Sequence, residues 1–203
     1  MKEAYLYKKL DRSKVRCDLC AHRCVIEDGK KGKCAVRENR SGTLYSLVYD
    51  KVISENVDPI EKKPLFHFLP GTQSLSIATP GCNFKCFYCQ NWQISQSPGD
   101  HGSIEGHEIP PEKIVKDAVI NNCKSIAYTY TEPTIFFELA YDTAKIAHEK
   151  GLKNAFVTNG FMTKECIDMI RPYLDAANID LKSFSDDFYR DKCSGRLKPD
   201  LIL

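Results

Sequence analysis

The sequence predicts an α/β protein in which short strands of a parallel sheet alternate with helices, preceded by a small cysteine-rich segment. Three observations support this prediction. Four short apolar stretches alternate with segments of helical patterning, polar motifs follow these stretches directly, and seven of the ten cysteines fall in two closely spaced sets. Alternation at this spacing is typical of βα units, of which we count about four.

The predicted strands of the sheet cover residues 75–78, 125–130, 155–158 and 176–181. The predicted helices run from Pro111 to about Asn122, from Thr134 to Lys150, and from Thr163 to Leu174. Proline is favoured in the first turn of a helix and glycine just past its end, which fits Pro111 and Gly151. Residues 95–107 are polar and contain glycine, so we predict a loop there.

The N-terminal third has a different pattern. Residues 43–49 and 52–53 are rich in β-branched and aromatic side chains and are strand-like. Residues 58–71 contain prolines that cannot continue a helix or a central strand, and we interpret them as a connector. We therefore expect a cysteine-rich module with its connector over residues 1–73 and an α/β part over residues 74–203.

Length and composition limit the possible functions. A chain of 203 residues can bury one core and a small appended module. Its 29 basic and 27 acidic side chains indicate no broad basic surface for nucleic acid. Residues 1–15 are charged throughout, which argues against a signal peptide or membrane anchor. The clustered cysteines then favour metal binding in a reducing cytoplasm over disulfides, with Cys123, Cys166 and Cys193 as small buried side chains.

The second cysteine set lies directly after the first predicted strand of the sheet. Cys82, Cys86 and Cys89 have the spacing C-x3-C-x2-C. Thiolates are soft ligands that suit zinc or an iron–sulfur cluster, and three ligands leave one metal position open, as in catalytic sites. A zinc loop with a distant fourth ligand, or three unligated thiols, are alternatives that the spacing alone leaves open.

The first cysteine set contains four members: Cys17, Cys20, Cys24 and Cys34. Four thiolates can close a tetrahedral site, and Gly29 and Gly32 allow a turn that brings the last cysteine back. A segment this small and polar is expected to need a metal in order to fold. Zinc is the simplest occupant and a second iron–sulfur cluster is the rival. His22 is an alternative ligand to one cysteine, although a solvated histidine fits as well.

An aromatic residue, Tyr88, stands before the third cysteine of the second set. The pattern C-x3-C-x-aromatic-C after a first strand resembles the signature of the radical S-adenosylmethionine (radical SAM) superfamily. This resemblance implies a [4Fe-4S] cluster on the three cysteines, with S-adenosylmethionine at its fourth position. It also implies a (β/α)6 barrel, here partial. We expect either a fragment or a partner that covers the open edge of the fourth strand.

The motifs after the later strands narrow the resemblance. They are Tyr130-Thr131-Glu132-Pro133, Thr158-Asn159-Gly160 and Asp180-Leu181-Lys182. Pyruvate formate-lyase-activating enzymes have two glycines, Glu and Pro, then T-N-G, then D-x-K, so only the glycines are missing here. With the N-terminal cysteines and residues 59–64, the chain looks like the AmmeMemoRadiSam-system radical SAM subfamily. The resemblance runs from Cys17 to near Arg196.

The resemblance implies a role for each motif residue. Tyr88 would lie at the adenine, Thr131 and Glu132 would receive the methionine amine, and Asn159, Asp180 and Lys182 would surround the ribose and carboxylate. Ordinary alternatives exist for some of them. Glu132 also suits the N-terminus of the following helix, and Asp180 and Lys182 alternate along one strand face, where a plain ion pair is common.

The implied activity is reductive cleavage of S-adenosylmethionine to a 5′-deoxyadenosyl radical that abstracts hydrogen from a substrate. The implied partners are S-adenosylmethionine, an electron donor such as flavodoxin or ferredoxin, and either a protein substrate or an AMMECR-type or Memo-type protein. The alternative class is a catalytically incomplete iron–sulfur or zinc-binding fragment. A two-site zinc protein that acts as an interaction module is a third hypothesis, and it requires zinc rather than iron at the second set.

Overall fold

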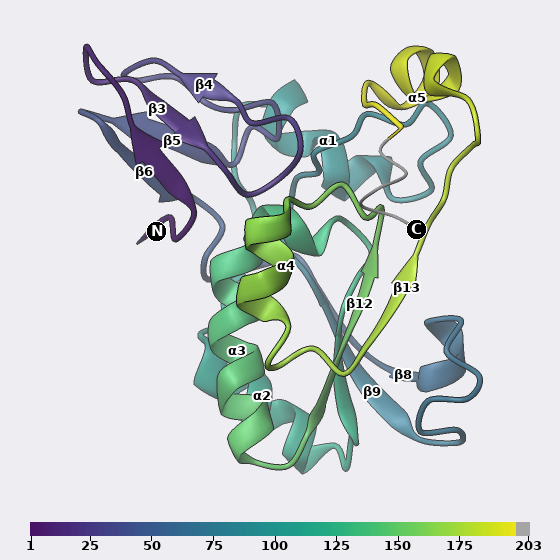
Figure 1. Ribbon diagram of the computed structural model, residues 1–203. Coiled ribbons are helices and arrows are strands. Elements are labelled where there is room, and N and C mark those ends of the chain that lie inside the picture. The colour runs from purple at the N-terminus through teal and green to yellow at the C-terminus, as the bar shows by residue number, and fades with distance from the viewer. Residues whose placement is uncertain (198–203) are drawn as a thin grey trace.

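The computed structural model describes residues 1–197, and its centre is a five-stranded mixed sheet (Figure 1). The strand order is β13-β12-β11-β9-β8. The strands are β8 (Ser54–Pro59), β9 (Gln73–Ala78), β11 (Ser125–Tyr128), β12 (Lys153–Thr158) and β13 (Ala176–Ile179). The last four are parallel, and β8 pairs antiparallel with β9. The α/β class and the four predicted strands are confirmed.

The central strands form because nearly all their residues can be buried. Every residue of β11 is buried, as is every residue of β9 after Gln73. Strands covered on both faces have this continuous burial. The polar side chains among them have partners: the amide of Asn154 donates to the carbonyl oxygens of Ala144 (3.2 Å) and Tyr173 (3.0 Å). β13 alternates half-buried and exposed residues, and within residues 1–197 it pairs with β12 alone.

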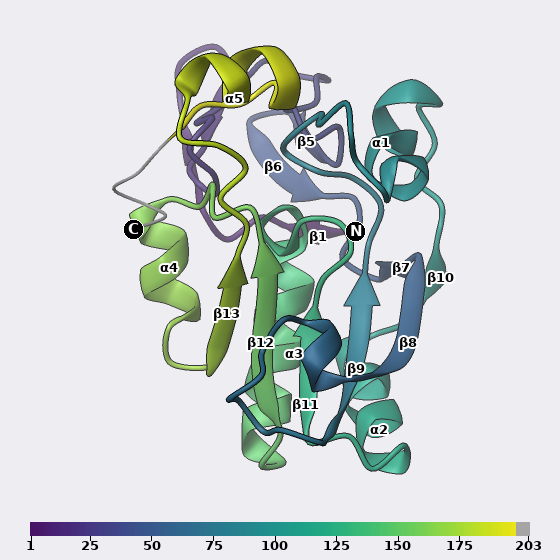
Figure 2. The same ribbon diagram turned by 90° about the vertical axis from the view of Figure 1, so that its right-hand side faces the viewer.

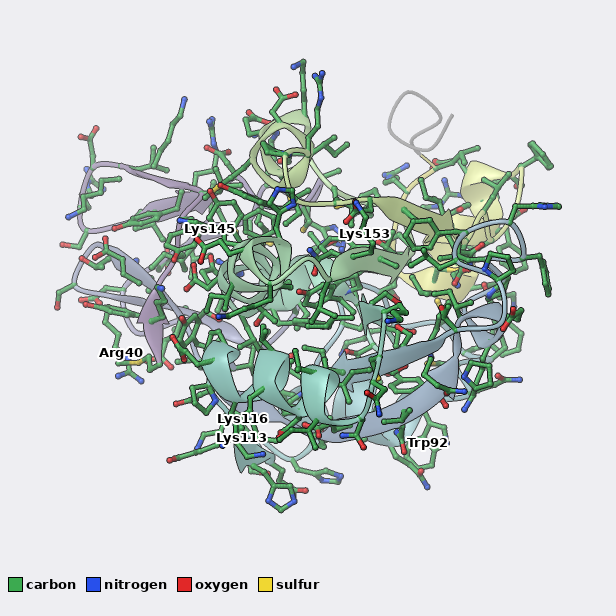
Figure 3. The ribbon with its side chains drawn as sticks, turned by 90° about the horizontal axis from the view of Figure 1, so that it is seen from below. Arg40, Trp92, Lys113, Lys116, Lys145 and Lys153 are labelled. Carbon is green, nitrogen blue, oxygen red and sulfur yellow. The ribbon has the colours of Figure 1, made fainter. Side chains whose placement is uncertain are left out.

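Residues 60–72 lie over one face of this sheet, and three helices cover the other (Figure 2). They are α2 (Pro111–Ile120), α3 (Phe137–Glu149) after the 3-10 turn η2 (Pro133–Phe136), and α4 (Lys164–Ile170). α4 begins where the Thr163 hydroxyl accepts a hydrogen bond from Cys166 N. Figure 3 shows the molecule from below, with Lys113 and Lys116 on α2 and Lys145 on α3. All three lysines are exposed.

Two small antiparallel sheets lie in the N-terminal third. The first sheet contains β1 (Lys2–Glu3), β6 (Thr43–Ser46) and β5 (Arg37–Arg40), and the second contains β2 (Tyr7–Lys9), β3 (Val15–Cys17) and β4 (Val25–Ile26). β7 (Lys51–Val52) pairs with β10 (His107–Glu108). Buried side chains of this region, including Val36 and Leu44, belong to the same apolar core as Ile135 and Phe136. The cysteine-rich region is therefore packed onto the α/β part.

The edge strand β8 was not among the predicted strands. Residues 54–59 form it, with Ser54 opposite Ala78 and Pro59 opposite Gln73, while η1 (Ile60–Lys62) follows directly. Pro59 is tolerated because it is the last residue of an edge strand. Residues that we assigned to the first module thus complete the main sheet. The division of the chain at residue 73 stays a prediction.

The prediction of a loop over residues 95–107 is wrong for the first half of this range. Residues Trp92–Asp100 form helix α1, which contains Pro98. Proline lacks the N–H that would bond to the carbonyl four residues earlier. That carbonyl, of Ile94, instead accepts the N–H of Gly81 at 3.0 Å. A contact from a distant segment therefore allows a helix where the local sequence favours a loop.

A fifth helix, α5 (Asp186–Cys193), was also not predicted. Its start follows ordinary rules, since the Ser185 hydroxyl accepts from Phe188 N and two aspartates occupy the first turn. Its inner side buries Tyr189 and Cys193 in a small apolar cluster with Phe84 and Phe161. The helix thereby packs against the loop that carries the second cysteine set.

We expect Gly81→Ala to lower the free energy of unfolding by more than 2 kcal/mol, from overpacking plus backbone strain. Gly81 has φ +105°, and an added Cβ would lie 2.7 Å from Val36 Cγ1 and 3.3 Å from Cys34 O. Urea unfolding measures the loss. Gly71→Ala is the control, because its φ is +74° but its Cβ would meet nothing within 4 Å. Equal losses in the two variants would show that the contact with Val36 has no energetic weight.

Candidate functional site

A cavity of about 460 Å³ lies where the parallel strands of the sheet end. All nine residues that the sequence predicted for the second cysteine set and the cofactor line it: Cys82, Cys86, Cys89, Tyr88, Thr131, Glu132, Asn159, Asp180 and Lys182. They come from the segments that follow four different strands. Convergence at the carboxyl ends of strands is where α/β proteins place their chemistry.

The cysteine loop is held by backbone contacts with α5 and by side chains from two other segments. Lys85 N donates to Cys193 O (2.9 Å), and Phe87 N donates to Lys192 O (3.1 Å). The Gln96 amide donates to Phe84 O at 3.0 Å. From the N-terminal third, His22 Nε2 donates to Asn83 O at 2.8 Å. The loop therefore has fixed partners between its first two cysteines and directly after the second.

Glu132 is a buried carboxylate at the cavity wall. Its Oε1 accepts from Thr134 N (3.1 Å) and from the hydroxyls of Thr134 (2.5 Å) and Thr158 (2.6 Å). Among the described residues, its Oε2 accepts Asn159 N alone (2.8 Å), so this oxygen has acceptor capacity left. Burial raises the pKa of Glu132, and these hydrogen bonds oppose that rise. The carboxylate also caps the 3-10 turn η2 that follows it, which is the role in helix capping that the sequence analysis gave as an alternative for Glu132.

Asp180 and Lys182 form an ion pair of 2.8 Å after β13. Two backbone hydrogen bonds hold the chain here: Asp180 N donates to Thr158 O, and Lys182 N donates to the Tyr189 hydroxyl at 2.9 Å. Burial alone would lower the pKa of Lys182, but its hydrogen bond to Asp180 raises it above the ordinary value. The Lys182 ammonium is therefore held in its charged form at the cavity, paired with the Asp180 carboxylate.

Three other predicted residues use their side chains within the protein. The Thr131 hydroxyl donates to Thr79 O at 2.8 Å. The Asn159 amide nitrogen donates to Asn83 Oδ1 at 2.7 Å, and its oxygen accepts from Phe161 N at 3.0 Å. The Tyr88 hydroxyl lies 3.3 Å from Cys193 Sγ. These side chains shape the wall, and their direct contact with a cofactor stays a prediction.

Sequence reasoning missed a charged group on the opposite wall. Lys62 and Lys63 line the cavity, and each ammonium lies 2.7 Å from an oxygen of Asp58. The Tyr130 hydroxyl also donates to Asp58, and the Lys63 ammonium lies 4.8 Å from the centre of the Tyr130 ring. Burial would raise the pKa of Asp58, but the hydrogen bonds from both lysines hold it well below its usual range. Two cations and one anion leave this wall positively charged.

Tyr130 occupies a backbone conformation that favours glycine, with φ +63°. It stands where the activating-enzyme motif has its first glycine. Its carbonyl accepts the Asn91 amide at 2.8 Å, and its ring and hydroxyl are held as described above. The surrounding contacts keep a strained residue in place at the cavity wall, a feature that is common at functional sites. The missing glycine was the sequence signal for it.

The first cysteine set lines a second, much smaller cavity of about 20 Å³, with His22 among its lining residues. All ten cysteines are free thiols, and Cys123, Cys166 and Cys193 are buried as predicted. Within residues 1–197, no three Cys, His, Asp or Glu side chains are already gathered closely enough to hold a metal ion. This applies to both cysteine sets, so binding a metal would require thiol side chains to rotate within their cavities.

Fold and site together define an α/β protein with an open three-cysteine site at the ends of its parallel strands. Residues 76–203 match the family model described as the radical SAM superfamily. The chain belongs to this superfamily, as the cysteine motif predicted. Membership implies a [4Fe-4S] cluster and S-adenosylmethionine. No helix among the described residues has the length and apolar character needed to cross a membrane.

Similar proteins occur in Methanocaldococcus jannaschii. The chain is 50% identical to the uncharacterized protein MJ0808 over 98% of its own length and 58% of that protein. It is 27% identical to the uncharacterized protein MJ0674, covering 89% of this chain and 48% of that one. It is 25% identical to the putative glycyl-radical enzyme activating enzyme MJ1632, covering 64% and 49%. The chain thus spans about half the length of these relatives.

Proposed function

We propose that this chain is the S-adenosylmethionine-cleaving part of an oxidoreductase of the activating-enzyme-like type. Cys82, Cys86 and Cys89 would hold a [4Fe-4S] cluster, which when reduced would supply the electron for cleavage of S-adenosylmethionine to methionine and a hydrogen-abstracting 5′-deoxyadenosyl radical. The observation that carries the proposal is the single cavity shared by the three cysteines, Glu132 and the Asp180–Lys182 pair. Chemistry that the cofactor supplies needs the protein mainly to bind and orient it.

The cavity residues fit this cofactor set. Three thiols with an open fourth position suit an iron–sulfur cluster that must also bind a second ligand. The free lone pair of Glu132 Oε2 suits a cationic amine, and the Lys182 ammonium suits a carboxylate. S-adenosylmethionine presents both groups on its methionine end. The buried Phe84 supplies apolar wall.

The finer parts of the proposal concern substrate and partners. The similarity to MJ1632, whose name describes an activating enzyme, supports a protein substrate. The motif variant and the residues Lys62 and Lys63 support the AmmeMemoRadiSam-type subfamily, with an AMMECR-type or Memo-type partner and flavodoxin or ferredoxin as donor. The reducing conditions that an iron–sulfur cluster requires support a cytoplasmic location.

The proposal is tested by anaerobic reconstitution of the full chain with iron and sulfide. The loaded protein is reduced, S-adenosylmethionine is added, and 5′-deoxyadenosine is measured by mass spectrometry. We expect about four iron and four sulfide per cluster site and formation of 5′-deoxyadenosine. A full cluster without product would favour the catalytically incomplete alternative. Zinc in place of iron at these cysteines would favour the interaction module.

We expect Lys182→Met to weaken S-adenosylmethionine binding about 10- to 100-fold, because a charged hydrogen bond is worth about 1.5–3 kcal/mol. Equilibrium dialysis against the reconstituted protein measures the affinity, and the visible spectrum checks that the cluster is unchanged. Lys164→Met is the matched control, since Lys164 forms an exposed ion pair with Asp168 on α4, away from the cavity lining. Unchanged affinity in Lys182→Met would mean that Asp180 and Lys182 are a plain ion pair.

A further inference from the structure

Arg37, on β5, is a buried cation whose donors are only partly used. Its side chain is 2% exposed and forms an ion pair with Glu138 through Nη2. Its Nε and Nη1 have no hydrogen-bond partner among the described residues. Leaving a buried donor unpaired costs about 1–3 kcal/mol, more for a charged group. Native proteins contain few such groups, and an ion that completes the site is one explanation for them.

A second buried donor lies at the same place. Asn83 is 4% exposed, and its side-chain oxygen accepts from Asn159 while its Nδ2 has no partner within residues 1–197. Arg37 and Asn83 both line the cavity of about 20 Å³ that contains the first cysteine set. The unpaired groups are all N–H donors. Together they specify that this cavity should hold negative charge.

The remaining lining explains where that charge would come from. The cavity contains four thiols, and its apolar part comes from Leu19, Ile26 and Ile135. Neutral thiols are weak acceptors, whereas metal-bound thiolates carry charge and accept N–H donors. Four thiolates on a divalent ion have a net charge of −2, which a guanidinium and an amide N–H can stabilise.

We propose that this cavity binds one zinc ion as a closed site of four thiolates, from Cys17, Cys20, Cys24 and Cys34. Soft thiolates suit zinc, and four protein ligands are typical of its structural sites. The cavity volume of about 20 Å³ favours a single ion, since about 10–15 Å³ is enough for one water molecule. A four-iron cluster needs much more room. His22 has neither ring nitrogen free, because its Nε2 donates to Asn83 O and its Nδ1 lies 3.5 Å from the Lys33 ammonium.

The zinc site would position the loop that carries the second cysteine set. Asn83 directly follows Cys82, its backbone carbonyl is held by His22, and it lines the four-cysteine cavity. A Cβ added at Gly81 would lie 3.3 Å from Cys34 O, so the backbones of the two cysteine segments are close together here. Loading the first site therefore orders the wall against which the loop rests, without zinc taking part in electron transfer.

The test uses the full chain carrying Cys86→Ala, which removes a ligand of the second set. Its outcome is thus independent of S-adenosylmethionine cleavage. Metal content is measured by plasma mass spectrometry, and X-ray absorption at the zinc edge gives the ligands. We expect about one zinc per chain with four sulfur neighbours at about 2.3 Å. Less than 0.2 zinc per chain after growth with zinc, or a site of iron and sulfide, would overturn the proposal.

Variants then assign the ligands. Cys24→Ser and Cys34→Ser should each lose bound zinc, while Cys123→Ser, a buried cysteine outside both cavities, should keep it. Asn83→Asp places a carboxylate where the amide donor stood, and we expect zinc affinity to fall about 10- to 100-fold. Full zinc retention in the two ligand variants, or unchanged affinity in Asn83→Asp, would contradict the assigned ligands or the role of the N–H donors. Circular dichroism confirms that each variant is folded.

Discussion

Cys86→Ala is expected to abolish 5′-deoxyadenosine formation and to remove the [4Fe-4S] spectrum. The three cysteines of the second set line one cavity, and the motif contains no further cysteine that could replace Cys86. A cluster held by two cysteines has lost a covalent anchor, so iron content after reconstitution should fall to the background of the unloaded protein. The visible absorption of the cluster, iron analysis and mass spectrometry of the nucleoside measure the effect.

The matched control for this prediction is Cys123→Ala. Cys123 is buried near the end of α2 and lines neither cavity. This variant should keep both the cluster and the product. Retention of the cluster in Cys86→Ala would contradict the prediction and would direct attention to Cys193, whose thiol lies 3.3 Å from the Tyr88 hydroxyl at the same loop. The double variant Cys86→Ala/Cys193→Ala would then decide between the two thiols.

Glu138→Ala is expected to lower the free energy of unfolding by about 3–5 kcal/mol. Glu138 is fully buried on α3, pairs with Arg37 and accepts Tyr5 N at 3.0 Å. Removing one partner of a buried pair leaves the other charge uncompensated, which is why this loss is large. Urea unfolding followed by circular dichroism measures it, with the midpoint shifting at constant m-value.

Two further variants separate the buried pair from ordinary ion pairs. Asp168→Ala removes an exposed partner of Lys164 and should change stability by less than about 1 kcal/mol. The double variant Arg37→Met/Glu138→Leu replaces both charges with apolar groups and should recover most of the loss, when measured on metal-free protein. A loss in Glu138→Ala no larger than that in Asp168→Ala would show that the pair is far more hydrated than its burial indicates.

The strands and the convergence of the main site could be predicted from local sequence. Continuous apolar runs between turn residues indicate buried parallel strands, and the polar motifs stand at their carboxyl ends. Because those ends meet at one edge of the sheet, chain order alone placed Cys82, Glu132 and Lys182 around one cavity. The thiol spacing also predicted the superfamily, which the family match confirmed.

Elements that depend on distant partners were missed. β8 has no clear alternation of polar and apolar residues and becomes a strand because β9 offers it an edge. α1 forms although it contains Pro98, since Gly81 N satisfies the carbonyl that proline leaves free. The lysines 62 and 63 reach the cavity because the segment after β8 folds over the open face of the sheet. None of these contacts has a local signal.

The sequence by itself determined the chemistry on offer: two sets of soft thiolate ligands, one of three and one of four, and charged residues after successive strands. Ligand preference is a property of residue type and spacing, which are readable directly. Only the tertiary structure decided which groups meet. Arg37 and Glu138 stand 101 positions apart, and Asn83 reaches the cavity of the first cysteine set from the loop of the second. Burial and unpaired donors are properties of the packed chain, because they arise only when distant segments exclude water from the same place.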